Sequence, residues 1–353
     1  MNALVLRENS LAVEDIPTPE CPTGWTRLHV LCAALNHRDQ YIREGKYARI
    51  QLPAVLGSDV CAHVPRDARN DIAVPRSPRN DIAPSSFSGE RVVVDPSFGW
   101  GADPRAQGKD FHILGMPTQG GFAEELCVPD ENIHPAPSHL TDEECAALPL
   151  AGVTAYRALM RQGACTAHDV VVITGIGGGV ATMAASFALA LGCKVIVTSR
   201  SHEKIDRVLE RITSPNITGV VTDAEGAWVS TLKKHAPTLV VDSIGGDMVN
   251  GYMDALVPGG RIAMYGTSKG EAPSFNLHRL YWKQITLIGS TMGTSQDFAD
   301  MLHFVNTHKI APIIDRVYTL EEGADAFDRM KNAEQIGKII IRIDGRLTKD
   351  EGR

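Results

Sequence analysis

The sequence has no excess of positive charge and no long hydrophobic run. Its 353 residues include 35 Lys and Arg against 42 Asp and Glu, which gives a formal net charge of −7. A nucleic-acid-binding surface needs a basic face, so this balance argues against that class of function. No apolar stretch reaches the ~18 residues that a membrane-spanning helix requires.

The amino-terminal segment lacks the basic residues of a targeting sequence. Residues 1–8 are typical of a short strand, and the acidic residues Glu8, Glu14 and Asp15 come early. This pattern differs from a secretory signal and from a mitochondrial presequence. We therefore expect a cytosolic protein.

Cysteines are widely spaced, and no two of them form a C-x-x-C pair. The seven are Cys21, Cys32, Cys61, Cys127, Cys145, Cys165 and Cys193. An odd number at such spacings argues against a disulfide framework and against a four-cysteine structural zinc site. We expect most of them to be small buried hydrophobic residues in a reducing compartment.

The remaining composition is that of a soluble globular protein, with 43% hydrophobic and 22% charged residues. At ~150 residues per domain, the length indicates about two domains. The first 130 residues have strand character, with short β-rich runs such as 28–31 and 91–94 between turn residues. We expect a β-rich domain over residues 1–130, with 295–353 packing back on it.

The pattern changes near residue 141. Thr141 and Glu144 have the spacing of a capping box, which predicts that a helix begins there. Beyond it, strands and helices alternate. Strands are predicted near 170–174, 194–198, 220–221, 239–241 and 261–265, with a helix over 182–191. Repeated β-α-β units predict an α/β domain with a doubly wound parallel sheet over residues 131–294.

One segment is duplicated. Residues 64–73 are followed at once by a second copy at 74–83, and eight of the ten positions match. Two copies are too few for a solenoid. The prolines and charges are typical of a surface loop.

A glycine-rich run between a predicted strand and a predicted helix is the most informative motif. It reads Gly175-Ile176-Gly177-Gly178-Gly179-Val180-Ala181. Glycines allow close approach of the backbone to a pyrophosphate, and the helix N-terminus offers unpaired N–H groups. The strict G-x-G-x-x-G pattern is not met. In the register that ends at Ala181, the first position is Ile176 instead of glycine. The flanking strand and helix nevertheless favour a dinucleotide site over a simple tight turn.

The end of the next strand indicates which dinucleotide is bound. An NAD site usually places an acidic residue there, on the ribose 2′-hydroxyl. This chain instead has Ser199, Arg200 and, slightly later, Lys204, which suit a 2′-phosphate. The pattern favours NADPH over NADH, and the alternative is a solvated basic turn.

Together with the glycine-rich run, four further stretches resemble the medium-chain dehydrogenase/reductase superfamily, specifically its zinc-independent quinone oxidoreductase-like branch. They are residues 148–156, 241–246, 259–261 and 287–293. The resemblance implies a GroES-like β domain with an active site against a Rossmann domain, and commonly a homodimer. It also implies that the cofactor is contacted by Thr154, Gly178, Gly179, Val180, Gly266, Thr267, Ser290 and Met292, and that Lys338 approaches its phosphates.

The same resemblance bears on zinc. Asn36, Ser58 and Ala151 stand where zinc-dependent relatives place their three metal ligands. Catalytic zinc takes Cys, His or carboxylate ligands, so we expect no metal. A rebuilt site using Cys32, His37, Asp59 or Cys61 is the alternative that the residues leave open.

Without a metal, another group has to stabilise negative charge on a substrate oxygen. In similar quinone and enoyl reductases, an Asn and a Tyr at the places of Asn36 and Tyr47 line the nicotinamide pocket. A Tyr hydroxyl is protonated at neutral pH and can donate a hydrogen bond or a proton. We predict Tyr47 as the orienting or acid group, with Asp39 bracing the loop.

These expectations define one principal function and two alternatives. The principal function is NADPH-dependent reduction of a quinone, an α,β-unsaturated carbonyl or a related small carbonyl compound. The first alternative is an enoyl-thioester reductase. The second is a non-catalytic NADPH-binding protein.

Overall fold

The computed structural model describes residues 1–65, 89–222, 226–272 and 274–343. The described chain divides into two compact units, residues 1–150 with 314–343 (unit 1) and residues 151–313 (unit 2). The duplicated segment lies, from residue 66 on, outside the described residues. No helix in the described ranges is long and apolar enough to span a membrane.

Unit 1 is built mainly of β-strands. Its longest strand path runs β10-β6-β5-β3-β18-β17, with β9 also paired to β3, while β2-β1-β4 forms a second sheet and β7-β8 a third. The strands are β1 (Asn2–Arg7), β2 (Ser10–Asp15), β3 (Trp25–Ala34), β4 (Ala54–Val55), β5 (Asp59–His63), β6 (Arg91–Val94), β7 (Ser97–Phe98), β8 (His112–Ile113), β9 (Glu125–Pro129), β10 (Ile133–Pro135), β17 (Ile314–Thr319) and β18 (Lys338–Arg342).

Among the described residues, four α-helices belong to unit 1 or begin in it: α1 (His37–Arg43), α2 (Asp142–Ala147), α3 (Pro149–Tyr156) and α10 (Gly323–Lys331). The predicted capping box is confirmed at α2, where Thr141 Oγ1 accepts from the Glu144 amide and Glu144 Oε2 accepts from the Thr141 amide. Because α2 packs on β3, β5 and β18, residues 131–150 belong to unit 1. The boundary between the two units therefore lies after residue 150 rather than at the expected 130/131.

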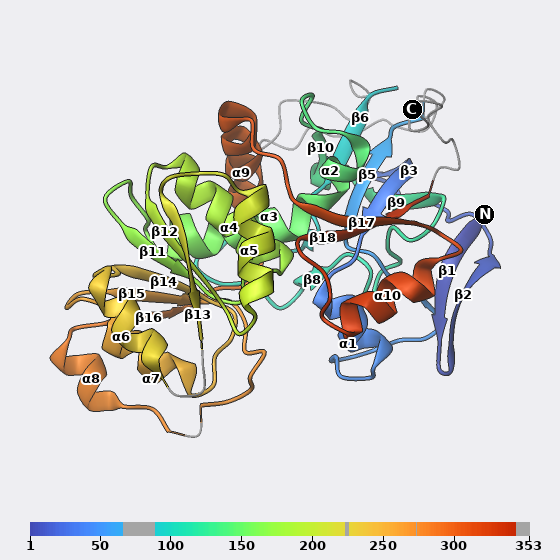
Figure 1. Cartoon of the computed structure of the whole chain (residues 1–353). Helices are drawn as coiled ribbons and strands as arrows, with labels where there is room; N and C mark the ends of the chain where they lie inside the picture. Colours follow the sequence, from blue (N-terminus) through green and yellow to red (C-terminus); the bar gives the residue numbers. More distant parts are fainter. Residues whose placement is uncertain (66–88, 223–225, 273, 344–353) are drawn as a thin grey trace. The chain divides into compact units, whose positions relative to one another are not determined.

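Unit 2 contains one six-stranded, all-parallel sheet in the order β13-β12-β11-β14-β15-β16 (Figure 1). Its strands are β11 (Val170–Ile173), β12 (Lys194–Ser199), β13 (Ile217–Val221), β14 (Leu239–Asp242), β15 (Arg261–Met264) and β16 (Thr286–Gly289). The order reverses between β11 and β14, which is the position where doubly wound sheets bind nucleotides, at the carboxyl ends of the strands. The doubly wound parallel sheet was therefore predicted correctly.

The helices of unit 2 alternate with these strands. They are α4 (Gly179–Ala190), α5 (His202–Arg211), α6 (Ala227–Lys234), α7 (Met248–Ala255), α8 (Leu277–Trp282) and α9 (Ser295–His308). Helix α4 packs on β11 and β12, and α5 packs on β12 and β13. Helix α9 ends before the boundary at 313, so residues 295–313 belong to unit 2 and not, as expected from the sequence, to the first domain.

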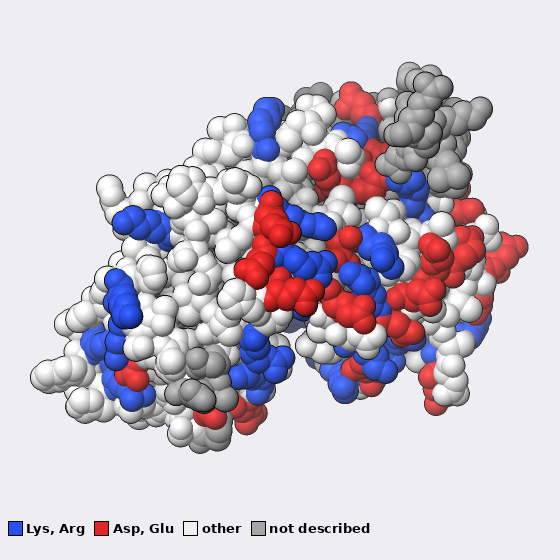
Figure 2. Space-filling model, viewed as in Figure 1, with Lys and Arg blue, Asp and Glu red and all other residues white. Residues whose placement is uncertain are grey.

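Each unit has its own hydrophobic core. In unit 2, Val172, Ile196, Val240 and Tyr252 form a buried cluster with neighbouring helix residues. In unit 1, the core includes Leu4, Leu28, Phe122, Phe327 and further residues of the strands. On the face shown in Figure 2, positive and negative side chains are interspersed.

Candidate functional site

The glycine-rich turn of unit 2 joins β11 to α4. Gly175 has φ 64°, a conformation that L side chains rarely adopt, and a Cβ there would lie 2.9 Å from Ile244 Cδ1. Gly178 is the N-cap of the 12-residue helix α4 and offers no side-chain acceptor to the first-turn amides. Such an uncapped start can bind a phosphate group. Gly178, Gly179 and Val180 therefore lie at a position that fits a dinucleotide.

The basic residues expected at a 2′-phosphate follow β12, the strand beside β11. Ser199 ends β12, and its Oγ accepts from the Ser201 amide at 3.1 Å. Arg200 is exposed, and Lys204 lies in the first turn of α5. Because adjacent parallel strands end at the same edge of a sheet, these residues lie at the same edge as the glycine turn.

Other predicted cofactor residues lie at the same edge of this sheet. Gly266 and Thr267 follow β15, and their loop joins the loop after β14 through the Ser268 amide, which donates to the Ser243 carbonyl at 3.0 Å. Ser290 follows β16, and its Oγ is buried with no hydrogen-bond partner among the described residues. An orphaned hydroxyl at this edge fits a polar ligand group.

Thr154 and Met292 lie together in unit 2. Thr154 Oγ1 is 3.9 Å from Met292 Sδ, and both residues are buried. Met292 has φ 43°, a left-handed backbone conformation that costs on the order of 1–3 kcal/mol for a non-glycine residue. Strain of this kind concentrates at binding and active sites.

Unit 1 holds a buried polar cluster around Asp59, at the start of β5. Lys338, at the start of β18, donates from its ammonium to Leu35 O, Asn36 Oδ1 and Asp59 Oδ2, each at 2.7 Å. Asn36 Nδ2 donates to the same Asp59 oxygen at 2.9 Å, and Asp59 Oδ1 accepts from the Leu150 amide at 2.6 Å. The cluster thus pairs one buried cation with one buried carboxylate.

This geometry corrects the expectation for Lys338. All three ammonium protons are donated to acceptors inside unit 1, and the residue is 3% exposed. No proton is left for a cofactor phosphate. The family resemblance implied that role, and nothing in the sequence indicated that Asp59 would bind the lysine.

Helix α1 carries Arg38 and Asp39 beside this cluster. Asp39 Oδ2 accepts from the Asn36 amide at 2.8 Å and so braces the turn into the helix. Complete burial raises the pKa of the Asp39 carboxyl, while the nearby Arg38 guanidinium acts in the opposite direction. Tyr47 follows α1 and is half-buried, with the Arg38 Cζ 5.1 Å from its ring centroid.

The residues at the expected zinc positions do not fit a metal. Ser58 Oγ accepts from Arg38 Nη1 at 2.7 Å and donates to Leu114 O at 2.7 Å, so both roles of the hydroxyl are taken. Asn36 Oδ1 already accepts from the Lys338 ammonium, and Ala151 has no donor atom. Among the described residues, no group of three or more His, Cys, Asp or Glu side chains could hold a metal ion.

The cysteine expectation needs one correction. Cys21 and Cys127 form a disulfide, with their Cα atoms 5.5 Å apart. The other five cysteines are free thiols, and four of them are buried. Sequence spacing could not reveal the pair, because 106 residues separate its members.

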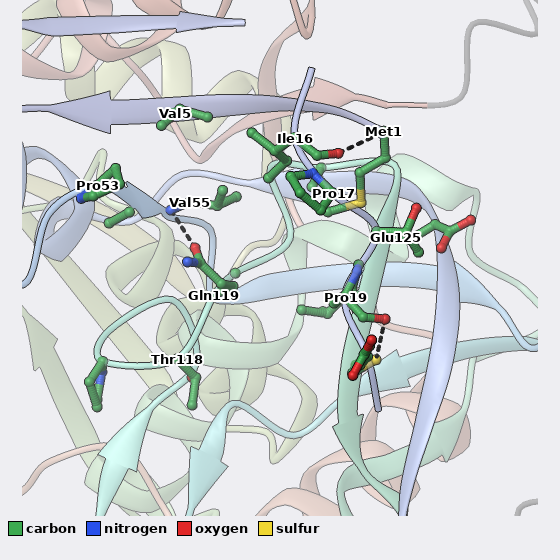
Figure 3. A pocket seen from close by; sticks show the side chains of 18 of the residues that line it. Met1, Val5, Ile16, Pro17, Pro19, Pro53, Val55, Thr118, Gln119 and Glu125 are labelled. Carbon is green, nitrogen blue, oxygen red and sulfur yellow. Dashed lines mark hydrogen bonds between the residues drawn. The ribbon is translucent and has the colours of Figure 1, made fainter. Parts of the chain in front are cut away.

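A cavity of about 630 Å³ opens in unit 1 beside this disulfide (Figure 3). Its walls come from β1, segment 16–22, residues 53–55 and residues 117–127, and they are mostly apolar. Gln119 Oε1 in the wall accepts from the Val55 amide at 2.7 Å. None of the predicted site residues lines this cavity, so we place no catalytic chemistry there.

Two family models match the chain. The alcohol dehydrogenase GroES-like domain matches residues 22–138, and the zinc-binding dehydrogenase domain matches residues 179–307. A zinc-type alcohol dehydrogenase-like protein YogA from Leptosphaeria maculans is 31% identical over 88% of each chain. An acryloyl-coenzyme A reductase from Sulfurisphaera tokodaii is 25% identical, covering 94% of this chain and 96% of its own. A solved NAD-dependent alcohol dehydrogenase superposes with a TM-score of 0.84 at 27% identity, covering 97% of this chain and 100% of its own.

Proposed function

The chain belongs to the medium-chain dehydrogenase/reductase superfamily of oxidoreductases, and on this basis we propose that it is an NADPH-dependent, metal-independent reductase. Its acceptors are quinones, α,β-unsaturated carbonyls or related small carbonyl compounds. The proposal that the enzyme is metal-independent rests on the Lys338 ammonium, which binds Asn36 and Asp59 in unit 1. This buried cation would repel a metal ion at the same place.

The residues of unit 2 support binding of a dinucleotide. The first turn of α4 would hold the pyrophosphate through backbone N–H groups, and Ser199 and Arg200 would bind the 2′-phosphate. When bound, the nicotinamide supplies a hydride. The protein's part is to position the acceptor, exclude water and stabilise the charge that forms on its oxygen.

Tyr47 is the proposed hydrogen-bond donor to that oxygen. The adjacent Arg38 guanidinium, whose Cζ lies 5.1 Å from the ring centroid, favours negative charge nearby. Asn36 and Asp39 act as positioning residues, because their polar atoms hold Asp59, Lys338 and the start of α1.

One observation favours a second function, reduction of an enoyl thioester. Two acryloyl-coenzyme A reductases are each 25% identical to this chain, one over 340 residues (94% of this chain) and the other over 355 residues (97% of this chain). An enoyl thioester is also an α,β-unsaturated carbonyl compound, so the same unit 1 residues would serve it.

The test is NADPH and NADH oxidation against quinones, enones and enoyl thioesters, together with metal analysis of the purified protein. We expect NADPH-dependent turnover without stoichiometric zinc. The Tyr47→Phe variant should lose about 10²-fold or more in kcat while its NADPH affinity stays unchanged. Binding of NADPH without turnover of any acceptor would instead indicate a non-catalytic NADPH-binding protein.

A further inference from the structure

Arg38 is buried and uses only one of its three nitrogens. Its side chain is 8% exposed, and Nη1 donates to Ser58 Oγ at 2.7 Å and to Leu114 O at 2.9 Å. Nε and Nη2 are buried and have no hydrogen-bond partner among the described residues. A buried guanidinium edge with two unused N–H groups is uncommon, because each unpaired donor is costly.

The unused edge has the shape that binds two oxygen atoms. Elsewhere in this chain the same edge is filled by a carboxylate. Arg7 donates from Nε and Nη2 to Glu14 at 2.8 and 2.7 Å, and Arg329 does so to Asp315. Arg38 is built alike but has no such partner.

The surroundings hold Arg38 in place without filling this edge. Its Nη1 is fixed by Ser58 and Leu114, and the Tyr47 ring lies near the guanidinium. Asp39 Oδ1 is 3.9 Å from Nη1, too far for a hydrogen bond and on the side that is already used. The Nε/Nη2 edge of Arg38 is therefore held in place and positively charged.

We propose that the Nε/Nη2 edge of Arg38 binds a substrate oxygen that carries full or developing negative charge. This rests on the proposed function and narrows its substrate class. The oxygen is either one of a substrate carboxylate or the carbonyl oxygen of an enone. In the enone case, a hydride adds at Cβ, and the electron pair of the Cα–Cβ π bond forms a new double bond between Cα and the carbonyl carbon. The π pair of the carbonyl group moves onto its oxygen, which gives an enolate. A solvent proton then adds at Cα.

The first test is calorimetric titration of the cofactor-free enzyme with crotonate, which needs no turnover. If the substrate oxygen belongs to a carboxylate, crotonate binds the unaltered protein. Arg38→Met then weakens binding about 10- to 100-fold, as expected for a charged hydrogen-bonded pair. Arg38→Lys keeps the charge but loses the fork, and its affinity should be intermediate. Arg7→Met, which removes an equivalent but exposed edge, should bind as the unaltered protein does.

The second test is NADPH-dependent reduction of 3-penten-2-one, a neutral enone of similar size. If the charge develops only during reaction, Arg38→Met lowers kcat at least 10-fold with little change in KM. Thermal melts of both Arg38 variants check that each one folds.

The outcomes separate this inference from the proposed function. Crotonate binding that depends on Arg38, without turnover of any acceptor, would uphold the role of Arg38 and reject the reductase. Turnover that is unchanged in Arg38→Met, together with crotonate binding that is absent or unchanged, would overturn the role of Arg38 and leave the reductase standing. Failure of the unaltered protein both to bind crotonate and to reduce the enone would also overturn the role of Arg38.

Discussion

Lys338 Nζ lies 2.7 Å from Asp59 Oδ2, although the two residues are 279 positions apart in the sequence. Both side chains are buried, and the ammonium also binds Leu35 O and Asn36 Oδ1. A buried pair of this kind is weak evidence for stability by itself, but removing one partner leaves an uncompensated charge.

Loss of Lys338 should therefore destabilise the protein strongly. We expect Lys338→Met to lower the free energy of unfolding by about 3–5 kcal/mol, measured by denaturant titration. Lys46→Met, at the exposed pair with Glu44, is the control and should cost less than about 1 kcal/mol. Equal effects of the two variants would contradict a buried, paired Lys338.

Arg200 should determine preference between the two nicotinamide cofactors. Arg200→Ala is expected to raise KM for NADPH about 10-fold and to leave KM for NADH unchanged, because only NADPH carries the 2′-phosphate. Steady-state kinetics with each cofactor measure this. Arg207→Ala, on the following helix α5 and paired with Glu203, is the control. A parallel change for both cofactors would reject the assignment.

His134 should make stability depend on pH. Burial lowers its pKa to about 4, below the ordinary value of 6.5. Between these values the unfolded chain binds a proton that the folded protein does not, so stability falls as pH decreases from about 6.5 to 4, by about 3 kcal/mol in total. His134→Gln should remove this part of the dependence. The measurement is the difference in unfolding free energy between the two proteins at pH 7 and pH 4.5, and a constant difference would be the contrary result.

The edge of the unit 2 sheet should join two copies of the chain. Among the described strands, β16 pairs only with β15. Leu287 on β16 is 40% exposed, and Trp282 at the end of α8 is 72% exposed. An exposed apolar edge strand is usually covered. Leu287→Asp should convert a homodimer into a monomer in sedimentation equilibrium. Val317→Asp, at an exposed position on β17, an edge strand of the unit 1 sheet, should not. A monomeric unaltered protein would refute the dimer.

The Cys21–Cys127 disulfide can be checked by counting thiols. In denaturant without reductant, the protein should show five reactive thiols, and after reduction seven. Cys21→Ser should lower the free energy of unfolding by about 4–5 kcal/mol under the chain-entropy model, because the closed loop is long. Cys165→Ser, which removes a free thiol, is the control. Seven thiols before reduction would mean that all cysteines are reduced.

Local patterns in the sequence were sufficient to predict much of unit 2. The apolar runs at 170–174 and 194–198 became β11 and β12, because strands buried on both faces have few polar positions. The helix after the glycine turn starts at 179 rather than 182, since glycine spacing does not mark an N-cap.

Long-range pairings could not be predicted in this way. Nothing near Lys338 indicates Asp59, and nothing near Cys21 indicates Cys127, because each contact depends on how distant strands assemble. The unpaired edge of Arg38 could not be predicted either, because a sequence shows which residue is present but not which of its atoms lack partners.

The position of β18 also affects the order in which the molecule can form during synthesis. It pairs with both β3 and β17 inside the sheet of unit 1, yet the ribosome makes it after all of unit 2. We therefore expect unit 2 to fold once it emerges, whereas residues 1–150 then still lack the β18 partner of β3 and the lysine partner of Asp59. A nascent chain stalled before residue 338 should therefore be protease-resistant in unit 2 and sensitive in unit 1.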